Sequence, residues 1–277
     1  MIKIFKIILI CILCINICFA KIIKTNDFCI IENNVKNVND DTLVIFDVDN
    51  VLLQPKDQLL KHYYEKFMEF YKDAKARLNP AQADELYSLM LIQRQIEPVD
   101  NNMVKLINKT QKNGIKVLAL THCYIKPFGK ISSIEDWRIK ELKRLGYYFD
   151  KSWNKLKNKE LKPLLSKDST KNSVFKQGIV FTNGHSKGDA LKSFLNYAGF
   201  MPKKILFIDD RRKFLESVET FAQKSGIEFL GIEYTVVEDS KVTPLNKKRS
   251  QLQLDTLEKE HKWLSDQEAD AQIKRIK

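Results

Sequence analysis

Two aspartates, Asp47 and Asp49, stand one residue apart in the apolar stretch VIFDVDNVLL, residues 44–53. Alternate side chains of an extended chain share a face, so both carboxylates can point into one cleft. Carboxylates in such a place can serve as a nucleophile, as a general acid and base, or as ligands of a divalent cation. The alternative interpretation is a polar turn at the end of a strand.

Three further apolar stretches lead to polar residues of complementary chemistry. Thr121 ends one of them, Lys187 begins the helix that follows another, and Asp209 and Asp210 end the third. In an open parallel sheet, ligands bind beyond the carboxyl ends of the strands, so these residues are expected to converge in space. The N–H groups at the start of the Lys187 helix favour an anion. The combination indicates a site for phosphoryl transfer.

Strands and helices must alternate along the chain to place these residues at one edge of a sheet. Apolar runs predict strands at residues 42–49, 115–121, 178–182, 203–210 and 227–235. Apolar residues three and four apart predict helices between these strands, one of which begins at Ser133 and ends near Gly146. The alternation predicts an α/β fold with a mostly parallel sheet flanked by helices.

The motifs, taken in order, resemble those of the haloacid dehalogenase (HAD) superfamily. They are DVDNV at residues 47–51, Thr121 after an apolar strand, Lys187 at the start of a helix, and the acidic pair Asp209–Asp210. More narrowly, the stretches LALT, NGHSKGDALKSFL and ILFIDDRRKFLESV are similar to an uncharacterised HAD-like family of secreted bacterial proteins. The resemblance covers roughly residues 42–235 and implies a HAD-like Rossmannoid core with a helical cap-type insert.

The resemblance also implies a role for each matching side chain. Asp47 would attack phosphorus as the nucleophile and form an aspartyl phosphate. Asp49 would protonate the leaving alcohol and then deprotonate the attacking water. Thr121, His122 and Lys187 would bind the phosphoryl group, and Lys187 would also hold the nucleophile. The implied activity is hydrolysis of a phosphomonoester, with a small phosphorylated metabolite as the substrate.

Mg²⁺ is the cofactor that the resemblance implies. Its ligands would be Asp47, the backbone carbonyl of Asp49, and one of Asp209 and Asp210. Asp210 is favoured as the direct ligand, with Asp209 in support. Asp49 favours phosphate-ester chemistry within the superfamily, because dehalogenases lack this acid and P-type ATPases carry Thr at its position.

Three features depart from the superfamily pattern. Val51 replaces the usual Thr of the first motif, and His122 and Cys123 stand where relatives often have a small residue and Arg. Phe214 occupies the place of the acidic or amide residue that commonly completes the fourth motif. This departure leaves open a second function, a catalytically degenerate HAD-like domain that acts as a secreted binding or host-interaction protein. A Cys123 nucleophile with a histidine base is a weaker alternative, because no Cys/His signature surrounds it.

Two regions are assigned outside the core domain, which is predicted to comprise residues 21–53 and 99–240. Residues 54–98 have helical periodicity and are predicted to form a cap that excludes water and selects the substrate. The aromatic residues of HYYEKFMEFY either line the substrate or pack inside this cap. Residues 241–277 are predicted to form a charged C-terminal helix. Arg138 could reach a substrate anion or lie on a helix surface.

Residues 1–20 have the layout of a secretory signal peptide, with a basic start, a short apolar centre and Ala20 at the end. They predict an exported protein, periplasmic or secreted, and an uncleaved membrane anchor is the alternative. Cleavage would leave Cys29 and Cys123, so the mature chain is not expected to depend on disulfides. The net charge is +12, but the lysines are scattered, and no nucleic-acid partner is expected.

Overall fold

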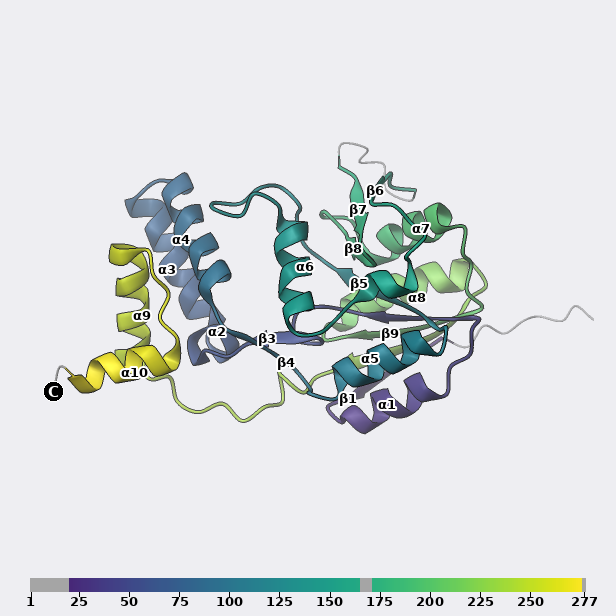
Figure 1. Cartoon of the computed structure of the whole chain (residues 1–277), viewed down its shortest axis with the longest axis horizontal. Helices are drawn as coiled ribbons and strands as arrows, with labels where there is room; N and C mark the ends of the chain where they lie inside the picture. Colours follow the sequence, from purple (N-terminus) through teal and green to yellow (C-terminus); the bar gives the residue numbers. More distant parts are fainter. Residues whose placement is uncertain (1–19, 165–170, 276–277) are drawn as a thin grey trace, which may run out of the picture.

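The computed structural model describes residues 20–164 and 171–275 (Figure 1). The predicted signal peptide therefore lies outside the described residues, apart from Ala20. The strands are β1 (Ala20–Thr25), β2 (Thr42–Phe46), β3 (Leu53–Pro55), β4 (Ile96–Pro98), β5 (Lys116–Thr121), β6 (Lys159–Leu161), β7 (Ser173–Lys176), β8 (Ile179–Phe181), β9 (Lys204–Asp209) and β10 (Glu228–Tyr234). The helices are α1 (Phe28–Lys36), α2 (Gln58–His62), α3 (Tyr64–Arg77), α4 (Pro80–Gln93), α5 (Met103–Lys112), α6 (Ile134–Arg144), the 3₁₀ helix η1 (Phe149–Ser152), α7 (Lys187–Ala198), α8 (Arg212–Lys224), α9 (Lys247–Glu260) and α10 (Asp266–Arg275).

Eight of these strands form one sheet in the order β1-β10-β9-β2-β5-β8-β7-β6. The strands from β1 through β8 in this order pair in parallel, and β7 and β6 extend one edge as antiparallel neighbours. All of β2 is buried, as expected for a central parallel strand covered on both faces. The prediction of an α/β fold with a mostly parallel sheet flanked by helices is confirmed.

Successive residues of β2 belong to two different apolar cores. Val44 and Phe46 pack in a core that includes buried residues of α1, α5 and α6. Leu43 and Ile45 pack in a second core with α7 and α8. Figure 1 shows α1 and α5 on one side of the sheet and α7 and α8 on the other. Asp47 is next in this alternation, so its side chain is directed to the face that α7 covers.

A third apolar core holds the inserted helices together. The antiparallel pair β3 and β4 leads from the sheet into α2, α3 and α4 and back (Figure 1). Phe67 is fully buried there, and its ring lies 5.2 Å from that of Tyr87 and 6.1 Å from that of Trp263, centroid to centroid. Tyr71 is also buried in this core. The aromatic stretch of α3 therefore packs this insert, and the packing interpretation is confirmed for these two residues.

The C-terminal segment contains two helices, α9 and α10, where the sequence analysis expected one. His261 ends α9 in the left-handed region, with φ of 55°. A capping box begins α10: the Glu268 carboxylate accepts from the Ser265 N–H at 2.8 Å, and Ser265 Oγ accepts from the Glu268 N–H at 3.3 Å. The spacing Ser-x-x-Glu was visible in the sequence and is the signal that was missed.

Two parts of the sheet were not predicted either. Residues 21–41 were assigned to the core domain but to no helix or strand. They contain most of β1 and all of α1, and β1 pairs along its whole length with β10. The β6–β7 hairpin was missed as well, because each strand has only three or four residues. In the described parts of the chain, no helix has the length and apolarity needed to cross a membrane.

Candidate functional site

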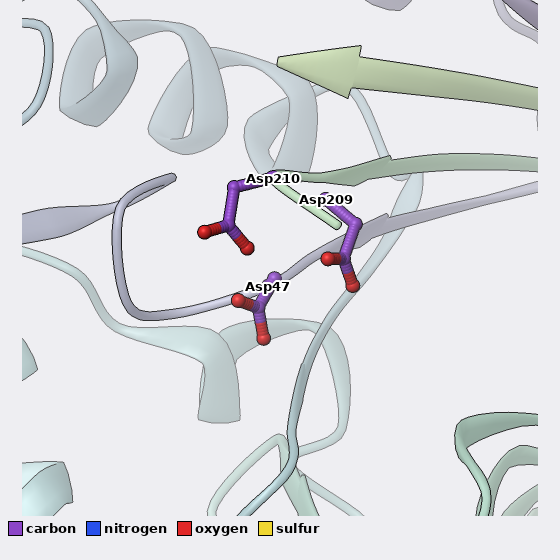
Figure 2. Close-up of side chains that lie close together, drawn as sticks. All are labelled: Asp47, Asp209 and Asp210. Carbon is purple, nitrogen blue, oxygen red and sulfur yellow. The ribbon is translucent and has the colours of Figure 1, made fainter. Parts of the chain in front are cut away.

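Three carboxylates meet at the carboxyl end of the two central strands, where the strand order reverses (Figure 2). Asp47 directly follows β2, Asp209 ends β9, and Asp210 comes next. The strands are in register, with Phe46 opposite Ile208, and the Asp47 N–H donates to the Ile208 carbonyl at 2.9 Å. One carboxylate oxygen from each aspartate lies within 4.8 Å of the other two.

Lys187 joins two of these carboxylates from the start of α7. Ser186 caps this helix by accepting from the Asp189 N–H, which places Lys187 at the first helical position. The Lys187 Nζ donates to Asp47 Oδ1 at 2.5 Å and to Asp209 Oδ2 at 2.6 Å. The side chain is fully buried, and a buried ammonium is tolerated only when it is paired in this way.

Three carboxylates outnumber the positive groups beside them, which are the Lys187 ammonium and the Arg211 guanidinium, whose Nε lies 4.0 Å from Asp210 Oδ2. The pKa of Asp47 is raised to about 8, mainly by burial and further by the charges of Asp209 and Asp210, against the opposing effect of Lys187. Burial also raises the pKa of Asp209. A divalent cation would balance this excess of negative charge, and three carboxylates supply the hard oxygen ligands that Mg²⁺ prefers. The donor set therefore fits the predicted metal ion.

The two aspartates of the fourth motif differ in their accessibility. Asp209 is fully buried, and its Oδ1 accepts from the Arg211 N–H at 2.9 Å while Lys187 takes the other oxygen. Asp210 lies at the edge of a pocket, and its Oδ2 accepts from Asn50 Nδ2 at 3.1 Å. Asp210 is therefore the better placed of the two for direct contact with a metal ion.

A pocket with an empty volume of about 350 Å³ opens above this cluster. Its lining includes most of the residues that the sequence analysis had proposed, and the full set is Asp47, Asp49, Asn50, Thr121, His122, Asp210, Arg211 and Phe214. Lys187 and Asp209 do not line it and instead hold Asp47 from within the protein. Sequence reasoning did not propose Asn50 and Arg211, although each is next to a motif aspartate.

Asp49 lies in this pocket with half of its side chain exposed. Its Oδ2 accepts from Arg138 Nη2 at 3.0 Å. Arg138 itself is buried, so the expectation that it lies on a helix surface was wrong. Arg138 is also absent from the pocket lining, which gives no support to its contact with a substrate anion.

The surroundings of Cys123 and of the two nearby histidines do not favour a cysteine nucleophile with a histidine base. Burial raises the pKa of the Cys123 thiol to about 12, which disfavours the reactive thiolate. The His122 ring nitrogen Nδ1 lies 3.1 Å from Thr182 Oγ1, and burial together with Lys187 lowers its pKa. His185 Nε2 bonds to the Lys171 carbonyl at 2.8 Å, which leaves it outside the pocket lining.

Within the described ranges, no group of three histidines is close enough to hold a metal ion. Cys29 and Cys123 are both free thiols.

Comparison with known proteins identifies the family. A model of the family described as "Protein of unknown function (DUF2608)" matches residues 24–270. The chain belongs to this family. An uncharacterized protein of Rickettsia prowazekii is 30% identical over 268 residues, which cover 95% of this chain and 96% of that protein. The predicted resemblance to an uncharacterised bacterial family is therefore confirmed at the level of this family.

Two chlamydial relatives carry names that refer to the outer membrane. A candidate outer membrane protein of Chlamydia pneumoniae is 25% identical over 143 residues, 52% of this chain and 48% of that protein. Another from Chlamydia trachomatis is 26% identical over 196 residues, 69% of this chain and 68% of that protein. The crystal structure of a candidate haloacid dehalogenase-like hydrolase from Burkholderia xenovorans covers 74% of this chain and 88% of that one, with a TM-score of 0.37 and 9% identity. At that score it adds nothing to the fold, which rests on the strand order.

Proposed function

We propose that this protein is an exported, Mg²⁺-dependent phosphohydrolase that cleaves a small phosphomonoester through an aspartyl phosphate on Asp47. The observation that carries the proposal is the cluster of Asp47, Asp209 and Asp210 around Lys187, with an excess negative charge directed into a pocket. Three clustered carboxylates that outnumber their positive partners and lie at a pocket are typical of a functional site.

In the first step, Asp47 attacks the phosphorus atom of the bound ester. Lys187 engages its Oδ1, so Oδ2 is the oxygen that forms the new bond to phosphorus. The bond from phosphorus to the leaving alkoxide breaks as Asp49 gives that oxygen a proton. Thr121 and His122 line the pocket and contact the phosphoryl oxygens.

In the second step, a water molecule attacks the phosphorus of the aspartyl phosphate. Asp49, now ionised, takes a proton from this water, and the bond from phosphorus to Asp47 breaks to release inorganic phosphate. The carboxylates of Asp47 and Asp210 and the backbone carbonyl of Asp49 would hold the Mg²⁺, with Asp209 fixing Lys187 beside them. When bound, the ion supplies positive charge to the phosphoryl oxygens.

The export part of this proposal rests on the signal-type residues 1–20 and on the names of the chlamydial relatives. N-terminal sequencing of the protein recovered outside the cytoplasm should begin at Lys21. Recovery of a chain that still begins with Met1 would contradict cleavage and point to an uncleaved anchor.

The activity is tested by phosphate release from an aryl phosphate with Mg²⁺ and with EDTA. Chelation should abolish release, and Asp47→Asn should reduce kcat by about 10⁴-fold or more, as loss of a nucleophile does in other hydrolases. Asp41→Asn is the matched control, because Asp41 precedes the other end of β2 and only pairs with Lys203 on the surface. Absence of both release and Mg²⁺ binding would instead favour the degenerate binding or host-interaction protein.

A further inference from the structure

A buried row of charges connects the pocket to the base of the inserted helices. Arg138 on α6 donates from Nη2 to Asp49 Oδ2 at 3.0 Å and from Nη1 to Glu141 Oε2 at 2.8 Å. The other oxygen of Glu141 accepts from Arg94 Nη2 at 3.3 Å. Only Asp49 at the pocket end is exposed, while Arg138, Glu141 and Arg94 are each at least nine-tenths buried.

Trp137 keeps both guanidinium groups in place. The Arg138 guanidinium lies 4.6 Å from the centroid of the indole, and that of Arg94 lies 5.7 Å from it. Each oxygen of Glu141 is committed to one arginine, so the two arginines share a single carboxylate. Such a buried arrangement has little freedom to change, because breaking one pair would leave an uncompensated charge in the interior.

The far end of this row marks the point where the inserted helices return to the core. Arg94 follows α4 directly, and β4 begins two residues later. Any movement of α4 relative to α6 therefore acts on the Arg94–Glu141 contact, and through it on Arg138. Within the described chain, this row is a direct polar path from α4 to Asp49.

We propose that Arg138 is a positioning residue that fixes Asp49 for proton transfer, and that Glu141 and Arg94 couple this position to the inserted helices. The proposal rests on the proposed phosphohydrolase activity. Half of the Asp49 side chain is exposed, and without a partner it would sample several rotamers. Arg138 engages Oδ2, so Oδ1 is left to exchange the proton with the leaving group.

Dependence on the leaving group distinguishes this role from a merely structural one. An alkyl phosphate needs a proton on its departing oxygen, whereas dinitrophenyl phosphate releases a stable anion without one. For Arg138→Met, kcat/KM for the alkyl substrate should fall about a hundredfold or more, while that for dinitrophenyl phosphate changes by about threefold or less, because only general-acid catalysis is lost. The inhibition constant of inorganic phosphate should stay unchanged, since Arg138 does not line the pocket.

Three companion variants keep the test decisive. Arg144 is exposed at the end of the same helix, so the Arg144→Met variant should behave as the wild type with both substrates. Arg138→Lys keeps the positive charge, so it should retain part of the activity with the alkyl phosphate. The retention should be only partial, because an ammonium cannot bridge two carboxylates as the forked guanidinium does. If Arg138→Met fails to fold, the comparison of the two substrates is made with Arg138→Lys instead. Arg94→Met should show the same leaving-group pattern as Arg138→Met with a smaller loss.

The outcomes separate this proposal from the activity on which it rests. Equal losses with both substrates in Arg138→Met, or no loss with either, would overturn the positioning role while leaving the phosphohydrolase intact. An Arg94→Met variant without leaving-group dependence would remove the coupling to the inserted helices. A wild-type protein that hydrolyses neither substrate would refute the proposed activity and this inference together.

Discussion

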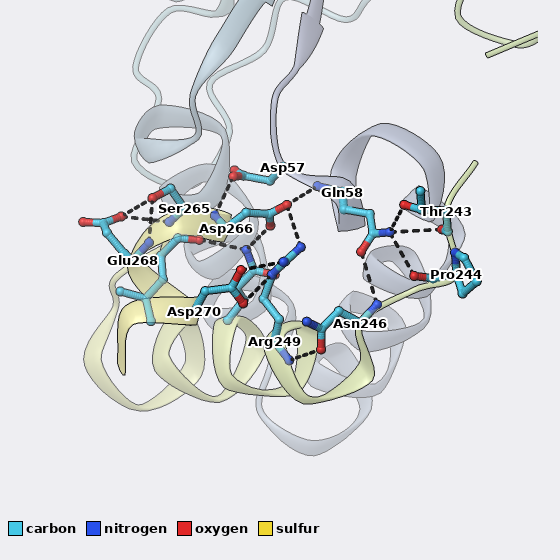
Figure 3. A network of polar contacts seen from close by, with 12 residues as sticks. Asp57, Gln58, Thr243, Pro244, Asn246, Arg249, Ser265, Asp266, Glu268 and Asp270 are labelled. Atoms are coloured by element: carbon cyan, nitrogen blue, oxygen red, sulfur yellow. Dashed lines mark hydrogen bonds and ion pairs between the residues drawn. The ribbon is translucent and has the colours of Figure 1, made fainter. Parts of the chain in front are cut away.

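Two polar clusters of this protein bury aspartates in opposite ways. In the pocket cluster, Asp47 and Asp209 share the single ammonium of Lys187. Asp210 adds a third carboxylate, and Figure 2 shows the three side chains together. In the C-terminal cluster, Asp57 accepts from the Trp263 indole N–H at 2.9 Å. It also accepts from the Asp266 backbone N–H at 3.0 Å (Figure 3). Asp57 thus has a separate neutral donor for each oxygen.

The rest of the C-terminal cluster also pairs charges directly. Arg249 donates to Asp266 at 3.0 Å and to Asp270 at 2.6 Å, and these contacts hold α10 against α9 (Figure 3). Gln58 donates to the carbonyls of Thr243 and Pro244, which ties the segment before α9 to the start of α2. In the C-terminal cluster, Asp57, Asp266 and Asp270 each accept hydrogen bonds on both oxygens and fasten the chain. The carboxylates of the pocket cluster instead lie at a pocket. Burial of a carboxylate is therefore no mark of function by itself, and access to a pocket is what distinguishes the two clusters.

The largest stability effect is expected from Lys187→Met, which removes the only ammonium of the pocket cluster. Two buried carboxylates would lose their partner, and the free energy of unfolding in EDTA should fall by about 3–5 kcal/mol. Added Mg²⁺ should restore part of this loss by supplying positive charge. Denaturant unfolding measures both, with the exposed Lys224→Met as the control. A loss no larger than that of Lys224→Met would show that the pocket carboxylates do not depend on Lys187.

A smaller effect is expected when the C-terminal cluster loses one donor. Trp263→Phe keeps an aromatic ring beside Phe67 but removes the N–H that donates to Asp57. The free energy of unfolding should therefore fall by about 1.5–3 kcal/mol. Phosphate release per folded molecule should stay at the wild-type value. In a double-mutant cycle with Asp57→Ala, the two losses should be less than additive, because both remove the same bond. Additive losses, or lost activity, would contradict a purely fastening role.

The smallest effect is expected at the pair of Arg249 and Asp270, whose side chains are 19% and 39% exposed. Arg249 holds the pKa of Asp270 below its usual range, so this pair stabilises the folded state above the unfolded pKa of Asp, about 4. The stabilisation is lost as the pH falls through the lower, folded pKa. Arg249→Met should therefore lower the melting temperature by about 1–3 °C at pH 7, a figure typical of surface ion pairs, and by less at pH 3. A difference that grows towards pH 3 would contradict this assignment.

The motif residues and the α/β alternation were predictable because their signals are local. Asp47 and Asp49 follow an apolar run, Ser186 and Lys187 begin a helix, and the parallel register then brings the strand ends together. The Ser-x-x-Glu capping box that begins α10 is equally local and could have been recognised. No such signal was found for β1, which forms a strand by pairing in parallel with β10 at the edge of the sheet.

The sequence by itself therefore determined which side chains could do chemistry and on which strand ends they lie. Only the tertiary structure decided which side chains Asp49 and Asp57 contact. Arg138 meets Asp49 across 89 positions of sequence, and Trp263 meets Asp57 across 206. These pairs depend on how α6 and the C-terminal segment pack, and periodicity reports which face of a helix is buried but not what it is buried against. The family resemblance already predicted that Lys187 holds Asp47, whereas only the fold showed that Arg138 holds Asp49.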